Sequence, residues 1–429
     1  MTEDYSWIPA EIKCFFNEDY GKTLLIKGAP GSGKTVFALT LLSTLKGNGA
    51  YLSTRVDSDT LYMQHPWIKE KIAPDNIIDA TKSESGPTSV AKEVSIKALK
   101  YSNVPEFMKA VYTRTDKMEH PIIIIDSWEA VAFYTGHYEQ RDREELENNL
   151  CDVSRRTKTK IILLVEYTGQ TALDYLVDGV VVVESDFFEE RRLRRMVMQK
   201  LRGCQITNPV RLFSLNKGVF KCFGEFKGVE LAVETPIIPD SIPDLSATRF
   251  STGIKDLDRV TNGYGVFNLF EGDYITYDLL AHALSINALN LGRRLIFAST
   301  MHPDYITKIS AFVKQEHRSN IEQVEEIKDI RDKIKDESTI VLINLEEIED
   351  VDTAVREIMT LFKAQECKVM CFGGRKGCDE LESFASTHIK TKFISGVPCI
   401  YGEFPRTEIH AMELDLSENI PKITLTPIV

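Results

Sequence analysis

The sequence lacks the features that mark membrane and secreted proteins. No apolar run approaches the roughly 20 residues that a helix needs to cross a bilayer. The first seven residues are acidic and contain no apolar core of a secretory signal. These two absences argue against membrane insertion and export. We therefore expect a cytoplasmic protein with no membrane partner.

Cysteine is sparse, and basic residues are outnumbered by acidic ones. Eight cysteines are scattered over 429 residues. The spacing of Cys367, Cys371 and Cys378, with His388 beyond them, fits no common zinc pattern. We expect reduced, mostly buried thiols. The formal net charge of −12 argues against broad nucleic-acid binding unless a local basic patch overrides it.

One motif dominates what is present. Residues 28–35 read GAPGSGKT, a complete G-x-x-x-x-G-K-[ST] phosphate loop. The apolar run 23–27 before it is typical of a buried strand, and the run 36–42 after it is typical of a buried helix. In such loops backbone N–H groups and the lysine bind the phosphates, and the final hydroxyl ligates Mg²⁺. The sequence thus predicts ATP and Mg²⁺ bound by Gly28, Ala29, Pro30, Gly31, Ser32, Gly33, Lys34 and Thr35.

A second segment supports the first. Residues 121–128 read PIIIIDSW, an apolar strand that ends in a carboxylate. Alone, this pattern is better explained by a core strand with a solvated terminal aspartate. With a phosphate loop upstream, it predicts Asp126 as the residue that holds the Mg²⁺ shell. We therefore assign Lys34 and Asp126 to the catalytic centre, and Thr35 and Asp126 to the metal.

Length and composition indicate two domains. A chain of 429 residues with 43% apolar and 27% charged residues is typical of a soluble globular protein with more than one core. Three prolines between residues 236 and 243 indicate an extended linker. We place the domains at 1–232 and 248–429, with the linker at 233–247.

Parts of the sequence of the first half recur after the linker. Three segments correspond, namely 20–28 with 264–272, 50–54 with 296–300, and 122–126 with 340–344. The phosphate-binding residues do not recur, because Gly272 is followed by DYITYDL, which contains no glycine and no lysine. Asn344 stands where the first half has Asp126. The first half also carries about 28 extra residues, which we place as an insertion at 73–101.

Several segments resemble a known family. Residues 249–258 read RFSTGIKDLD and resemble the S-T-G-I-x-x-L-D phrase that opens each domain in the KaiC branch of RecA-like ATPases. Residues 190–203, ERRLRRMVMQKLRG, look like the C-terminal hairpin of a KaiC domain. Within that branch, LLIKG at 24–28, YLSTRV at 51–56 and HPW at 65–67 resemble the archaeal gas-vesicle regulator D family. The likeness covers most of the chain. It implies an α/β fold of two tandem RecA-like domains with largely parallel sheets, the second degenerate, and the alternative is an unrelated α/β domain after the linker.

The resemblance implies a role for the basic hairpin segment at 190–203. In KaiC-like rings its K-L-R reaches the nucleotide of the neighbouring subunit, which would give that role to Lys200 and Arg202 in a homo-oligomer. An edge hairpin with a solvated cationic face explains the basic run equally well. A third interpretation is nucleic-acid contact by Arg191, Arg192, Arg194 and Arg195. The segment Ile409–Asp415 stands at the corresponding place of the second half and is not basic.

The resemblance also bears on hydrolysis. KaiC-type ATPases have paired glutamates that polarise the attacking water, and here those positions are Arg55 and Val56. Losing such a base removes a contribution of about 10²–10⁴-fold in rate. Asp57, Glu129 and Glu166 are candidate substitutes. We favour Glu166, which follows the strand 161–165, because KaiC-like chains often place a glutamate there near the γ-phosphate.

Three functions follow from these features. The first is a regulatory switch that binds ATP, hydrolyses it slowly at most, and acts on a protein partner, with gas-vesicle control implied by the family. The second is a RecA-type recombinase accessory acting on DNA, which would need a basic face. The third is a scaffold that keeps ATP as a structural ligand. We favour the first, since the usual glutamates and the second site are missing.

Overall fold

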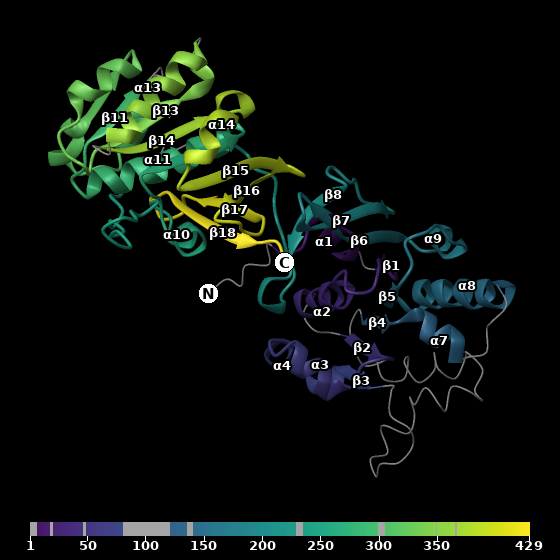
Figure 1. Cartoon of the computed structure of the whole chain (residues 1–429). Coiled ribbons are helices and arrows are strands. Elements are labelled where there is room, and N and C mark those ends of the chain that lie inside the picture. The colour runs from purple at the N-terminus through teal and green to yellow at the C-terminus, as the bar shows by residue number, and fades with distance from the viewer. Residues whose placement is uncertain are drawn as a thin grey trace. The chain divides into compact units, whose positions relative to one another are not determined.

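The computed structural model describes most of the chain (Figure 1). The described residues are 7–17, 20–45, 49–79, 121–134, 140–228, 235–298, 305–348, 350–364 and 367–429. They form two compact units, Met1–Gly224 with Ile428–Val429, and Glu225–Pro427. Most of the predicted insertion at 73–101 lies outside the described residues. Among those described, no helix has both the length and the apolar character needed to cross a bilayer.

The first unit is a nine-stranded sheet in the order β3-β2-β4-β5-β1-β6-β7-β8-β9. Its strands are β1 (Thr23–Lys27), β2 (Gly49–Ser53), β3 (Ile77–Asp79), β4 (Ile122–Asp126), β5 (Lys160–Val165), β6 (Gly179–Phe188), β7 (Arg191–Leu201), β8 (Val210–Ser214) and β9 (Lys221–Cys222). Strands β3 to β6 are parallel, and the pairings from β6 onward are antiparallel. Its helices are α1 (Ala10–Asn17), α2 (Lys34–Thr44), α3 (Ser58–Gln64), α4 (Ile68–Lys71), α7 (Trp128–Tyr134), α8 (Gln140–Thr157) and α9 (Ala172–Leu176).

Both faces of this sheet are covered. Leu24 of β1 shares a core with Phe37 of α2, while Leu25 shares a second core with Trp128 of α7. Successive side chains of a strand point to opposite faces, so these two cores lie on the two sides of the sheet. Strand β1 is buried at all five positions, which is typical of the centre of a parallel sheet covered on both faces. The phosphate loop therefore follows a central strand, at the sheet edge where α/β proteins bind ligands.

The second unit repeats this plan, with the sheet order β12-β11-β13-β14-β10-β15-β16-β17-β18. Its strands are β10 (Phe267–Gly272), β11 (Leu295–Ala298), β12 (Ile321–Val324), β13 (Ile340–Asn344), β14 (Lys368–Gly373), β15 (Thr387–Ile394), β16 (Val397–Phe404), β17 (His410–Asp415) and β18 (Lys422–Pro427). Its helices are α10 (Lys255–Thr261), α11 (Tyr274–Asn290), α12 (Tyr305–Ser310), α13 (Val351–Ala364) and α14 (Arg375–Leu381). The order is that of the first unit, strand for strand.

The register of the strands is also shared. Leu24 lies opposite Gly179 in the first sheet, and its counterpart Asn268 lies opposite Thr387 in the second. Both hairpins carry an irregularity at the same place, in β6 after Val180 and in β15 after His388. The shared order and register confirm the predicted fold class, two tandem α/β units with largely parallel sheets. They contradict the alternative of an unrelated second domain.

The same glycine ends the central strand in both units. Gly28 and Gly272 have φ angles of 157° and 138°. A Cβ atom would lie 2.3 Å from the carbonyl oxygen of Val183 in the first case and 2.0 Å from that of Thr391 in the second. Each strand thus turns past its neighbour too closely for a side chain.

One predicted correspondence is wrong. Ile409–Asp415 was expected to stand in the place of the basic hairpin strand, but residues 410–415 form β17. The counterpart of the basic strand β7 is β16, because β16 pairs with β15 as β7 pairs with β6. Strand β16 reads VPCIYGEF and contains no lysine or arginine. The second unit therefore still lacks an equivalent basic strand.

Candidate functional site

The phosphate loop connects β1 to α2 in the first unit. Gly31 and Gly33 have φ angles of 75° and 107°, in the left-handed region that favours glycine. Gly33 is the N-cap residue of α2, so no side chain of the cap residue satisfies the first N–H groups of this helix. The first N–H groups of a helix have no partner within it, so this end of α2 offers donors and a positive dipole end to an anion.

Lys34 crosses the inside of the loop. Its Nζ donates hydrogen bonds to the carbonyl oxygens of Gly28, at 2.8 Å, and Ala29, at 2.9 Å. Burial lowers the pKa of Lys34, and the nearby carboxylates of Glu166, Asp126 and Glu129 oppose that shift. No carboxylate lies within ion-pair distance of Nζ among the described residues. The ammonium group is thus held by neutral carbonyls, which a phosphate oxygen can outcompete.

The predicted metal ligands meet beside the lysine. Thr35 donates its hydroxyl hydrogen to Oδ2 of Asp126 at 2.6 Å, and Tyr51 donates to the same oxygen at 2.6 Å. Strands β2 and β4 are neighbours, so Tyr51 and Asp126 approach from adjacent strands. Burial and the Asp126 carboxylate raise the pKa of Tyr51. A hydroxyl and a carboxylate at this distance form an oxygen donor set of the kind that Mg²⁺ prefers.

The candidate bases are arranged around Arg55. Arg55 forms an ion pair with Glu166, and this hydrogen bond raises the pKa of Arg55. Oε1 of Glu129 accepts the backbone N–H of Glu166 at 2.8 Å, whereas its Oε2 is buried and has no hydrogen-bond partner among the described residues. Asp57 instead caps α3, accepting from the backbone N–H of Thr60 at 2.9 Å. Asp57 therefore has a structural role, and Glu166 and Glu129 remain the carboxylates that face the site.

Arg194 is the residue that the sequence did not single out for this site. Its Nη1 donates to the carbonyl oxygens of Ser32, at 2.9 Å, and Gly31, at 3.3 Å. The side chain is buried, which lowers its pKa. Its Nε donates to the carbonyl oxygen of Val429, and no Asp or Glu side chain among the described residues forms an ion pair with Arg194. No sequence pattern marks this contact, because it depends on the register that places Arg194 opposite Ser185 in the hairpin.

The nucleic-acid interpretation of the basic strand is wrong for two of its four arginines. Arg191 and Arg194 are buried, so they cannot contact a nucleic-acid backbone. Arg192 is exposed and donates to the Ser185 hydroxyl at 3.0 Å. The largely alternating burial along β7 is that of an amphipathic strand with one face on the core.

The structure does not bring Lys200 and Arg202 to the phosphate loop of their own chain. Lys200 lies opposite Val180, near the start of β6, whereas the loop follows the end of the parallel strand β1. Its Nζ donates to the carbonyl oxygens of Asp174, Tyr175 and Val177, at 2.9, 3.3 and 2.6 Å. Arg202 forms a 3.3 Å ion pair with Asp178 and donates to the Tyr175 carbonyl. A role at a neighbour's nucleotide stays a prediction.

The corresponding place in the second unit has no loop. Only Asp273 separates β10 from α11, and its Oδ2 accepts the backbone N–H of Phe393 at 2.9 Å. Asn344 accepts the backbone N–H of Glu346 at 3.2 Å instead of facing a metal. Across the described residues no group of three or more histidine, cysteine or acidic side chains is placed to hold a metal ion. The eight cysteines are free thiols, and six of them are buried.

Comparisons with known proteins relate the first unit to GvpD gas vesicle proteins. Residues 12–201 match the family model of the GvpD gas vesicle protein, P-loop domain. Two proteins of Halobacterium salinarum are similar to the chain. Protein GvpD2 is 33% identical over 271 residues, covering 61% of this chain and 53% of that protein. Protein GvpD1 is 31% identical over 272 residues, covering 61% and 49%.

The chain thus spans about half the length of the curated relatives it matches. The matched range contains the phosphate loop, Asp126, Glu166 and the basic strand. These matches confirm the predicted closeness to the GvpD P-loop family and the presence of a P-loop domain. The wider likeness to KaiC stays a prediction.

Proposed function

We propose that this chain is a nucleotide-dependent switch that acts on a protein partner. The first unit would bind ATP with Mg²⁺, and the second unit would bind no nucleotide. The observation that supports this best is the complete phosphate loop beside a Thr35–Asp126 pair, in a region that matches a P-loop family model. The family description and the names of the relatives lead us to place the partner in gas-vesicle control.

The residues present fit the ligand. A Cβ at Gly31 would meet no described residue within 4 Å, so the described part of the chain leaves open space on this side of the loop. Lys34 would move from the carbonyls of Gly28 and Ala29 to the β- and γ-phosphates, and Thr35 and Asp126 would hold Mg²⁺. Bound Mg²⁺ would neutralise charge on the phosphates. The backbone N–H groups at the start of α2 would orient the β-phosphate.

Slow hydrolysis follows from the Arg55–Glu166 pair. We assign the base to Glu166, with Glu129 positioning it through the backbone N–H of residue 166. Arg55, which stands where KaiC-like chains have a glutamate, neutralises this base and holds it by an ion pair. The ion pair occupies a carboxylate oxygen of Glu166 that would otherwise be open to the attacking water. Turnover well below the enzyme median of about 10 s⁻¹ is therefore expected.

The two other functions have less support. A recombinase accessory would need a basic face for DNA, and two of the four arginines in the basic strand are buried. A scaffold with structural ATP would show no turnover and the same partner binding with and without nucleotide. Immobilised protein should capture its partner from a lysate of the native host in an ATP·Mg²⁺-dependent way, and Lys34→Ala should not. Equal capture in all three conditions would favour the scaffold.

Arg194→Ala should weaken ATP binding by about three- to tenfold. The guanidinium shapes the loop through two carbonyls, and one or two such hydrogen bonds are worth about this much. Titration calorimetry measures the change. Arg192→Ala is the matched control, because Arg192 lies on the same strand but is exposed. Equal affinities of the two variants would show that Arg194 does not support the loop.

ATP·Mg²⁺ should shift the chain toward oligomers. A ligand shared across an interface stabilises that interface by linkage. Arg202→Ala should reduce the shift while leaving the fold intact, because the Arg202 side chain is about half exposed and, within the described part of the chain, pairs with Asp178 and the Tyr175 carbonyl. Light scattering at several protein concentrations measures this. A monomer at every concentration with saturating nucleotide would refute the role of Lys200 and Arg202.

A further inference from the structure

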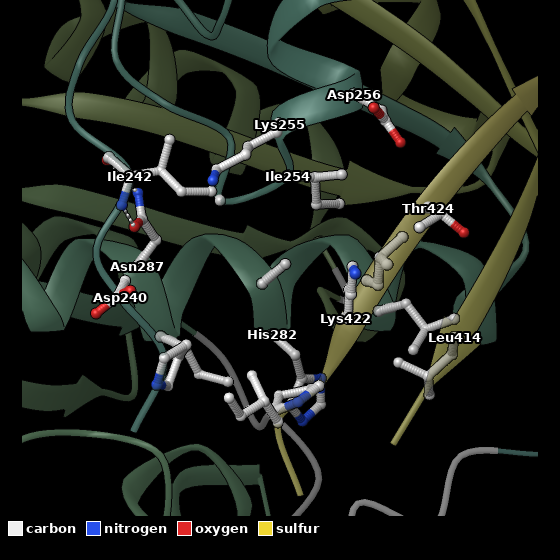
Figure 2. A pocket seen from close by; sticks show the side chains of 18 of the residues that line it. Asp240, Ile242, Ile254, Lys255, Asp256, His282, Asn287, Leu414, Lys422 and Thr424 are labelled. Atoms are coloured by element: carbon white, nitrogen blue, oxygen red, sulfur yellow. Dashed lines mark hydrogen bonds between the residues drawn. The ribbon is translucent and has the colours of Figure 1, made fainter. Parts of the chain in front are cut away.

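The second unit contains a pocket of about 370 Å³ on the helix that follows the missing loop. Its walls come from the linker residues 239–242, from α10, from α11 and from the β17–β18 hairpin (Figure 2). Most of the inner wall is apolar. It includes Ile242, Ile254, Leu279, Ala283, Ile286, Leu414 and Ile423. Pockets of this size and character are typical of small-molecule sites.

The same place in the first unit is filled by aromatic rings. Phe213 of β8 lies opposite Cys222, as Met412 of β17 lies opposite Leu425. Leu425 is therefore the counterpart of Cys222. Ile423 lies two residues before Leu425, and Phe220 lies two residues before Cys222, so Ile423 is the counterpart of Phe220. The rings of Phe220 and Phe213 stack at 4.6 Å, and Phe220 lies 4.7 Å from the ring of Phe37 on α2. The first unit thus has a packed phenylalanine ring where the second unit has the smaller Ile423 in the pocket wall.

Two asparagines in the wall hold neighbouring segments in place. Oδ1 of Asn287 accepts the backbone N–H of Ile242 at 2.7 Å, and its Nδ2 donates to the carbonyl of Ile242 at 3.0 Å. These two bonds fix the linker against α11, as Figure 2 shows. Asn290 likewise donates to the carbonyl of Phe312 and accepts the N–H of Lys314. A wall fixed in this way needs little rearrangement to receive a ligand.

The charges around the pocket balance. Its lining includes the cations Lys255, Arg259 and Lys422, and the anions Asp240, Asp256 and Glu418. Arg259 pairs with Asp256 at 3.4 Å, and Asp256 also accepts the backbone N–H of Leu425. His282 hydrogen-bonds through Nδ1 to the carbonyl of Asp278 at 2.7 Å. An apolar wall within a balanced rim favours a ligand without net charge.

We propose that this pocket binds a neutral, largely apolar small molecule. The degenerate unit would then be the effector-binding half of the chain, with its nucleotide chemistry lost and a ligand site in the space that aromatic rings fill in the first unit. The site does not depend on the proposed ATP-dependent function. None of the residues that line the pocket belongs to the phosphate loop or is a candidate base.

The full chain should bind the neutral, solvatochromic probe prodan at one site, with a blue-shifted and saturable emission. Ile423→Phe places in the pocket the residue type that the first unit has there, and it should weaken prodan binding by at least about tenfold through steric overlap. Leu291→Phe is the matched control, because Leu291 is exposed at the end of α11 and does not line the pocket. It should bind prodan like the wild type, and so should Lys34→Ala.

Circular dichroism and thermal melts establish that Ile423→Phe is folded. Ala283→Leu also narrows the pocket and serves as a second variant whose larger side chain fills it. The proposal is wrong if prodan shows no saturable binding to the wild type. It is equally wrong if both folded fill variants bind prodan with unchanged affinity, because the probe would then sit elsewhere.

Discussion

Replacing Lys34 by alanine is expected to abolish ATP·Mg²⁺ binding to the chain. The lysine lies inside the loop, within 3 Å of two loop carbonyls, and no other lysine among the described residues has that position. Loss of one charge-assisted contact to phosphate costs at least about 1.5–3 kcal/mol, or roughly ten- to hundredfold in affinity. Titration calorimetry should give one site per chain for the wild type and no measurable heat for the variant.

Lys69→Ala serves as the control, since Lys69 is an exposed lysine of the same unit. It should bind ATP like the wild type. A stoichiometry of two sites per chain would contradict the view that the second unit has lost its nucleotide site. Unchanged affinity of Lys34→Ala would place the nucleotide outside the phosphate loop.

The core of the candidate site was predictable because it is local in sequence. Eight consecutive residues carry the phosphate loop, and the strand before it and the helix after it lie where the apolar runs indicate. Asp126 is distant in sequence, but a parallel sheet brings the carboxyl ends of its strands to one edge. The hydrogen bond from Thr35 to Asp126 shows this convergence.

The parts that the sequence did not reveal depend on pairing between distant segments. Tyr51 donates to Asp126 only because β2 and β4 are neighbours, and Arg194 contacts the loop only because of the hairpin register. A tyrosine or an arginine in a strand does not by itself indicate a contact with the metal ligand or with the phosphate loop. A buried tyrosine in an apolar strand is most often a core residue.

The repeat predicted the second unit well in its parallel strands and poorly in its hairpin. The segments aligned in sequence occupy equivalent register positions in β1, β2 and β4 and their counterparts. The hairpin was misplaced mainly because the connection between β4 and β5 is ten residues longer than that between β13 and β14. Lys160 and Lys368 occupy equivalent register positions, but they lie 34 and 24 residues after the ends of β4 and β13. The length of such a connection is less constrained than that of a buried parallel strand.

Glu166→Gln should lower ATP turnover by about 10²–10⁴-fold, because an amide cannot take the proton of the attacking water. Arg55→Ala should act in the opposite direction and raise turnover up to about fivefold, since it releases Glu166 from a partly exposed ion pair worth up to about 1 kcal/mol. Phosphate release at saturating ATP measures both.

Glu129→Gln distinguishes positioning from catalysis. A glutamine at 129 can still accept the backbone N–H of Glu166 through its carbonyl oxygen, so the geometry of the site would be kept and turnover should change little. The unpartnered Oε2 of Glu129 makes this carboxylate the rival for the role of base. A larger loss in Glu129→Gln than in Glu166→Gln would transfer the role to Glu129. In that case Arg55→Ala should leave turnover unchanged, because Arg55 is paired with Glu166 and not with Glu129.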